Sequence, residues 1–125
     1  MDIALLAATL AITIGIAHSV LGERFILIRL FRRTDIPHLF GSPEFTKHTL
    51  RFAWHLTTVA WWGLAAIIVL IAQDRASSAV LLHVLSATFL VSALVAAVGS
   101  RLRHLSWVAF AMIAALLLVA ARSVP

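Results

Sequence analysis

The chain has 125 residues, of which 62% are hydrophobic and only 12% are charged. A soluble domain is typically about half apolar and about a quarter charged, and a small domain keeps much of its surface in contact with solvent. The excess of apolar residues therefore excludes an ordinary water-soluble protein and predicts that lipid covers much of the surface. The sequence contains no cysteine, which excludes disulfides, iron–sulfur clusters and thiolate metal sites.

The formal net charge of +5 does not indicate nucleic-acid binding, because most of the basic residues flank hydrophobic segments. Beside such segments, lysine and arginine set the membrane orientation and contact anionic lipid headgroups. We therefore expect the lipid bilayer, and no nucleic acid, to be a partner of this chain.

Four stretches are long and apolar enough to be membrane helices, since about 20 mostly apolar residues span the hydrocarbon core. In chain order they cover about 3–22, 50–72, 78–99 and 105–121. They predict an all-α protein with one domain, an integral membrane four-helix bundle. The long connection after the first helix contains Pro37, Gly41 and Pro43, which we expect to interrupt any helix. Its apolar and basic start, 25–33, either extends the first helix or lies along the interface.

Charge predicts the orientation of the four helices. Eight basic residues lie in or beside the connections that follow the first and third helices, namely Arg24, Arg29, Arg32, Arg33, Lys47, Arg51, Arg101 and Arg103. The other side has only Arg75 and Arg122. The positive-inside rule places both basic connections in the cytoplasm and both termini outside. We expect a multi-pass protein of a bacterial-type inner (cytoplasmic) membrane, with a long cytoplasmic loop between helices one and two.

Five of the six histidines lie at or inside the predicted helices, where an ionisable side chain usually faces the protein interior or water. The second helix has a polar stripe with steps of three and four residues, formed by His48, Arg51, His55, Thr58 and Trp62. The first helix has a stripe of small residues around one histidine, formed by Ala8, Ala11, Gly15, His18 and Gly22. These stripes predict a histidine-lined site between the first two helices, near the cytoplasmic face.

Two neutral imidazoles that face each other across a bundle can bind haem b axially. We predict His18 and His55 as the axial ligands, with Arg51 contacting a propionate. A second version of this hypothesis is a zinc, copper or iron ion with His18 and His55 among its ligands. Both versions assign electron transfer or redox support to the protein. The other polar candidates are Glu23, His48, Thr58, His83 and His104.

The main alternative is a non-enzymatic accessory or structural subunit of a larger membrane complex, or a homo-oligomer, whose histidines only form hydrogen bonds between helices. A small proton-linked transporter or channel ranks third, since histidine can carry protons. An enzyme is less favoured, because there is no phosphate-binding loop and no acid within a predicted membrane helix to orient a histidine. We expect Glu23, at the end of the first helix, to pair with Arg24, Arg51 or an arginine between helices three and four.

Overall fold

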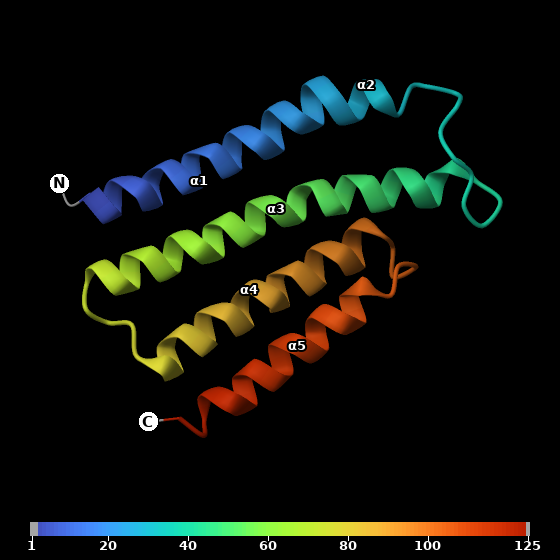
Figure 1. The fold of residues 1–125 in the computed structure, drawn as a ribbon. Coiled ribbons are helices and arrows are strands. Elements are labelled where there is room, and N and C mark those ends of the chain that lie inside the picture. Colours follow the sequence, from blue (N-terminus) through green and yellow to red (C-terminus); the bar gives the residue numbers. More distant parts are fainter. Residues whose placement is uncertain (1–2, 125) are drawn as a thin grey trace.

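The computed structural model describes residues 3–124, whose regular secondary structure is helical. The N-terminal helix α1 (Ile3–Leu21) continues through a π-helical segment, η1 (Gly22–Leu27), into the short α2 (Ile28–Leu30), as Figure 1 shows. A loop then leads to the remaining helices, α3 (Pro43–Ala72), α4 (Ser78–Gly99) and α5 (Ser106–Ala121). The expected all-α fold with four long helical segments is therefore present.

Three helical segments of the described chain are long and apolar enough to cross a membrane, namely Ile3–Leu30, Pro43–Ala72 and Ser78–Gly99. The fourth, α5, is apolar but has 16 residues, which gives a length of about 24 Å at 1.5 Å per residue. The hydrocarbon core is about 30 Å thick, so α5 alone is short for a full span. The length and composition of the other three helices indicate a membrane protein.

One helix is longer than the sequence predicts, and the first helical segment takes the longer of two predicted forms. Helix α3 begins at Pro43 rather than near residue 50, and Ser42 precedes it in an extended conformation. Proline is well suited to the first turn of a helix, where its missing N–H needs no partner. Pro43 therefore starts a helix instead of interrupting one. The first segment continues to Leu30, which is one of the two arrangements expected for 25–33.

The four segments form an open layer, because each contacts only its neighbours in the chain (Figure 1). Among residues 3–124, α1 and η1 contact α3, α3 contacts α4, and α4 contacts α5, whereas α1 contacts neither α4 nor α5. This arrangement differs from a closed bundle in leaving both faces of the layer uncovered. Large apolar side chains are exposed on it, among them Leu10, Leu94, Val98 and Leu116.

Small residues allow close contact within the layer. Ala93 of α4 is buried, and Ser86 of the same helix donates a hydrogen bond to the carbonyl of Ala114 in α5 at 2.7 Å. On the α3 side, Gly99 lies so close to Phe52 that a Cβ atom would overlap the phenylalanine side chain. These contacts fix the register of α4 between its two neighbours.

The two ends of the layer differ in charge. The loop 31–42 and the α4–α5 connection lie at one end, and the α3–α4 turn lies at the other (Figure 1). The first end, the basic end, contains the eight basic residues that were assigned to the cytoplasm. Three carboxylates there form ion pairs, Asp35 with Arg33, Glu44 with Lys47 and Glu23 with Arg51. Positive charge therefore remains in excess at this end.

In the loop at the basic end, Asp35 accepts two hydrogen bonds from the Arg33 guanidinium, at 2.8 and 2.5 Å. Hydrogen bonds to a carboxylate favour its charged form. Those from Arg33 lower the pKa of Asp35 to about 2, although both side chains are exposed.

Candidate functional site

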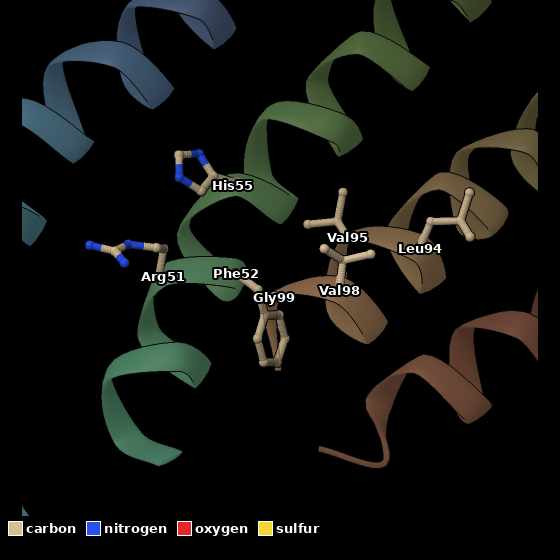
Figure 2. Close-up of a pocket in the computed structure, with 7 residues that line it drawn as sticks. All are labelled: Arg51, Phe52, His55, Leu94, Val95, Val98 and Gly99. Atoms are coloured by element: carbon tan, nitrogen blue, oxygen red, sulfur yellow. The ribbon is translucent and has the colours of Figure 1, made fainter. Parts of the chain in front are cut away.

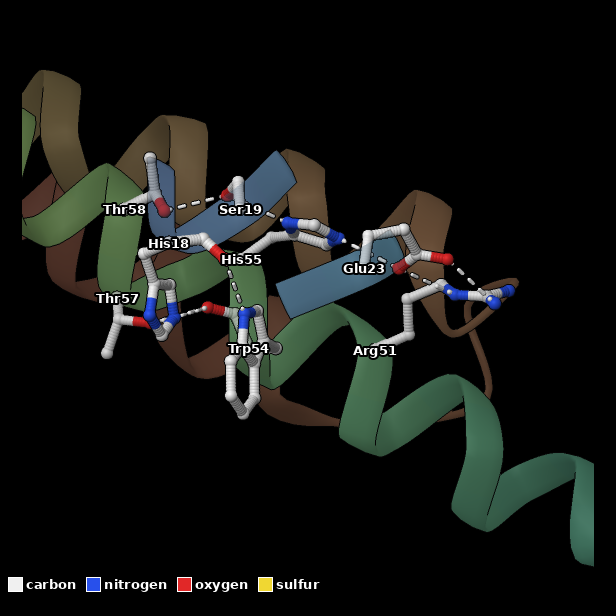
Figure 3. Close-up of polar contacts among 8 residues, drawn as sticks. All are labelled: His18, Ser19, Glu23, Arg51, Trp54, His55, Thr57 and Thr58. Atoms are coloured by element: carbon white, nitrogen blue, oxygen red, sulfur yellow. Dashed lines mark hydrogen bonds and ion pairs between the residues drawn. The ribbon is translucent and has the colours of Figure 1, made fainter. Parts of the chain in front are cut away.

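The polar side chains predicted on the first two long helices meet between α1 and α3 (Figure 3). This contact, the polar seam, is formed by His18, Ser19, Glu23, Arg51, Trp54, His55, Thr57 and Thr58. Ser19 and Glu23 are four residues apart, and so are Arg51 and His55, so each pair lies on one face of its helix. The two faces oppose each other and form the first of two rows of contacts, and His18 lies in the second.

The first row is a continuous chain of polar contacts that ends at the basic end. Thr58 donates a hydrogen bond to the carbonyl of Gly15 at 3.0 Å, and its Oγ1 lies 2.7 Å from Ser19 Oγ. Ser19 Oγ lies 2.9 Å from His55 Nδ1. His55 Nε2 lies 3.4 Å from Glu23 Oε2, and Glu23 Oε1 lies 2.9 Å from Arg51 Nη2. His55 is therefore held through both ring nitrogens, as Figure 3 shows.

The second row places His18 among aromatic rings. Its imidazole stacks on the Trp54 ring with a centroid distance of 4.5 Å and an interplanar angle of 4°. The Trp61 ring packs against His18 in a T-shaped arrangement, with 5.2 Å between the two ring centroids. His18 Nε2 lies 3.0 Å from Thr57 Oγ1 and 3.2 Å from the Trp54 carbonyl oxygen. In return, Trp54 Nε1 donates to the carbonyl of His18 at 3.1 Å.

Tryptophan rings fill the groove of small residues on the first helix. A Cβ atom on Gly22 would overlap the Trp54 indole, and one on Gly15 would lie 2.8 Å from Trp62 Nε1. The Trp62 indole also donates to the carbonyl of Ile12 at 3.3 Å. The stripe of small residues on the first helix is thus covered by side chains of α3 rather than left open for a haem ring.

The structure brings His18 and His55 into the same seam but into different rows. His18 precedes Ser19 on α1, and His55 follows Trp54 on α3. Consecutive residues of a helix point about 100° apart. Each imidazole therefore contacts its own partners, and the two are not arranged as an opposed pair around a common slot.

The other predicted histidines lie outside the seam. His48 is in the first turns of α3, and His83 is on α4, where its Nδ1 lies 2.7 Å from the carbonyl oxygen of Ala79. His104 lies between two phenylalanine rings, with Nδ1 2.9 Å from Ser106 Oγ. Throughout residues 3–124, no three histidine, aspartate or glutamate side chains gather closely enough to hold a metal ion.

Glu23, predicted at the end of the first helix as the acid close to the histidines, lies within the helical segment instead. The helical segment continues to Leu30, so Glu23 lies inside it, in the π-helical turn. Its partner Arg51 is one of those expected from the sequence. Ser19 was not predicted as a site residue, although its spacing of four from Glu23 places both on one face. Because the predicted first helix ends at residue 22, Glu23 falls outside it, and the shared face of Ser19 and Glu23 is not apparent from the sequence.

The first row can move a proton between a hydroxyl and a carboxylate, with His55 as the group that exchanges it. The order of serine, histidine and glutamate also resembles that of a nucleophilic triad. Such a triad needs donors for an oxyanion, often backbone N–H groups. Ser19 lies within α1, where the neighbouring backbone N–H groups are bonded inside the helix. The geometry therefore favours proton exchange or a structural role over acyl transfer.

Two cavities border the seam. One of about 500 Å³ lies between α3 and α4 and is lined by Arg51, Phe52, His55, Leu94, Val95, Val98 and Gly99 (Figure 2). In that view Arg51 and His55 extend away from the α4 side chains, so apolar groups form its walls. The second cavity, of about 330 Å³, lies beside His18 and includes Phe25, Trp54 and Trp61 among its walls.

Comparisons with known proteins place this chain in no group, since no protein-family model, no curated protein and no solved structure matches it.

Proposed function

We propose that this chain is a non-enzymatic membrane subunit that associates laterally with other membrane helices, either in a larger complex or with copies of itself. The observation that carries the proposal is the open layer, in which α1 and α5 each pack against one other long helix of the described chain. Helices in lipid associate through close packing and interhelical hydrogen bonds. An open layer offers both faces and two outer helices for such contacts.

In this proposal the polar seam is a clamp that fixes α1 and η1 against α3. The hydrogen-bonded row ends at the carbonyl of Gly15, part of the way along α1. A proton that moves along it would cross only part of the membrane. The row therefore supports a clamp more than it supports a proton-linked transporter or channel.

We also propose that α5 completes a four-pass arrangement in a bacterial-type inner membrane, with both termini outside. The support is the charge difference between the ends of the layer, eight basic residues against Arg75 and Arg122. The loop 31–42 and the α4–α5 connection are then cytoplasmic.

Lateral association is tested by placing a photo-crosslinking amino acid at Leu116 in α5, which is 67% exposed. Irradiation of native membranes should give a discrete product larger than the single chain, and mass spectrometry would identify the second component. The matched control is Ala114 on the same helix, which is 5% exposed and packs against α4. The proposal fails if probes at Leu116 and at the exposed Leu10 of α1 give no discrete product.

The second candidate is redox support with haem b or a metal ion on His18 and His55. The observation that favours it is that both imidazoles lie in one seam, with Arg51 one turn from His55. Both histidines would have to exchange their hydrogen bonds for iron. A Soret band and an alpha band on dithionite reduction, lost in His18→Ala and His55→Ala, would support this candidate. A featureless spectrum after growth with added haem, with no metal by elemental analysis, would exclude it.

A further inference from the structure

We propose that the cavity beside His18 binds the head group of a membrane quinol, a flat ring with hydroxyl groups on a lipid-soluble tail. This binding site is separate from lateral association, and it needs no partner protein. Three observations lead to it: the volume and walls of the cavity, two ring nitrogens that bond to no other residue among 3–124, and the depth of His18.

The cavity has the size and the walls that suit an aromatic head group. Its volume is about 330 Å³, and it lies between α1, η1 and α3. Pockets for small ligands measure about 300–1,000 Å³, so this one holds a ring rather than a whole lipid. Phe25, Trp54 and Trp61 supply aromatic walls, against which a flat ring stacks favourably.

The hydrogen bonds of His18 determine which nitrogen carries the proton. The Trp54 carbonyl can only accept, and the Thr57 hydroxyl already donates to that carbonyl. His18 Nε2 therefore carries the hydrogen that these two oxygens share. The neutral ring then has a lone pair on Nδ1, which has no hydrogen-bond partner among the described residues. Nδ1 is thus an acceptor available to a hydroxyl group.

The Trp61 indole supplies the complementary donor. The three other tryptophans, Trp54, Trp62 and Trp107, each donate Nε1–H to a backbone carbonyl. Trp61 makes no such bond within residues 3–124, although its ring lies 5.2 Å from that of His18. An unpaired N–H within lipid is costly, because no water is present to bond it. An acceptor and a donor beside one apolar cavity match a phenolic hydroxyl, which both donates and accepts.

The depth of His18 favours a quinol over a phospholipid. His18 lies six residues before Arg24, the first basic residue of this helical segment, which corresponds to about 9 Å along the helix, and the segment continues beyond Arg24 to Leu30. Phosphate and glycerol groups remain near the basic residues at the interface. A quinol head group dissolves in the hydrocarbon region and can enter the cavity from the side.

The test is a fluorescence titration of the purified full chain in nanodiscs. The probe is decylubiquinol, kept reduced with dithionite, and quenching of tryptophan emission by its ring is the signal. We expect saturable quenching. Decylubiquinone has no hydroxyl to donate a hydrogen bond to His18 Nδ1. It should therefore bind about tenfold more weakly, because that hydrogen bond is lost.

Two variants distinguish the site from partition into the lipid. Trp61→Phe keeps the aromatic edge and removes the donor, and should weaken binding about tenfold. Ala17→Phe, at a residue that lines the cavity, should abolish saturable quenching by filling it. The control Trp107→Phe, on α5, should bind as the original chain does, and circular dichroism should show that all three variants are helical.

Quenching that rises in proportion to the probe without saturation would overturn the proposal, since it indicates dissolved probe only. Saturable quenching that is unchanged in Trp61→Phe and Ala17→Phe would also overturn it. The measurement uses the isolated chain, so its failure would leave the proposal of lateral association untouched.

Discussion

At the scale of single residues, Glu23 joins two side chains of α3 across the polar seam, because it pairs with Arg51 and lies beside His55. Glu23→Gln should lower the stability of the folded chain by about 1 kcal/mol, since a partly exposed charge pair is lost. A double-mutant cycle with Arg51→Gln, measured by unfolding in mixed micelles, should give a coupling energy of similar size. Arg103→Gln is the control and should change stability by less than about 0.5 kcal/mol. A coupling energy near zero would show that the pair of Glu23 and Arg51 does not stabilise the folded chain.

The loop pair of Arg33 and Asp35 predicts a pH effect. Arg33 holds the pKa of Asp35 at about 2, below its ordinary value of 3.8. A lowered carboxylate pKa stabilises the folded loop above pH 3.8, and this contribution disappears as the pH falls through about 2. Arg33→Gln should return the pKa of Asp35 toward 3.8 in an NMR titration. Arg32→Gln should leave it unchanged, and an unchanged value in Arg33→Gln would refute the pairing.

The sequence predicts part of the seam at this scale and misses the rest for a physical reason. Helical spacing correctly places Arg51, His55 and Thr58 on the face of α3 that meets α1. Trp54 and Thr57 lie off that stripe, and their contacts with His18 depend on how closely the backbones approach. Spacing along one helix contains no information on that distance.

At the scale of helices, Gly22 controls the approach of η1 to α3, because a Cβ atom there would overlap the Trp54 ring. Gly22→Ala should lower the free energy of unfolding by about 1–3 kcal/mol, as overpacking does. Thermal unfolding in detergent measures the effect. Trp54→Leu removes the ring that a Cβ at residue 22 would overlap. The double variant should therefore lose less unfolding free energy than the sum of the losses in the two single variants. Full additivity would mean that Gly22 and Trp54 do not meet.

Hydropathy predicts α4 and α5 to within a residue, since both are uninterrupted apolar runs between polar turns. Hydropathy fails to predict the helix bounds where a helix continues through polar residues. The first turns of α3 are helical although they contain charged residues, and for 25–33 the sequence leaves two arrangements open, of which the structure has the helical extension to Leu30. The π-helical turn around Glu23 was not predicted, because its hydrogen bonds depend on packing against α3 rather than on residue type.

At the scale of the whole molecule, the charge difference between the ends predicts a labelling pattern. The sequence has no cysteine, so single cysteines can be introduced without background. Gln73→Cys lies at the α3–α4 turn and should react with a membrane-impermeant maleimide in intact cells. Thr34→Cys, in the loop at the basic end, should react only after the membrane is opened. The reverse pattern would invert the proposed orientation.

The sequence also leaves the arrangement of the four helices undetermined. Apolar runs give the number and length of helices, but a lipid-facing surface and a helix-facing surface are both apolar. Leu94 and Val98 are exposed on α4, and their residue types do not distinguish them from residues packed inside a closed bundle.

The open layer has a consequence for how the protein assembles during synthesis. Within the part of the chain that the structure describes, each long helix contacts only the one made before it and the one made after it. All members of the polar seam are present once α3 has been made, so α1 and α3 can pair while α4 and α5 are still missing. Helices α4 and α5 can then add one at a time, and no late step must bring the first helix to the last.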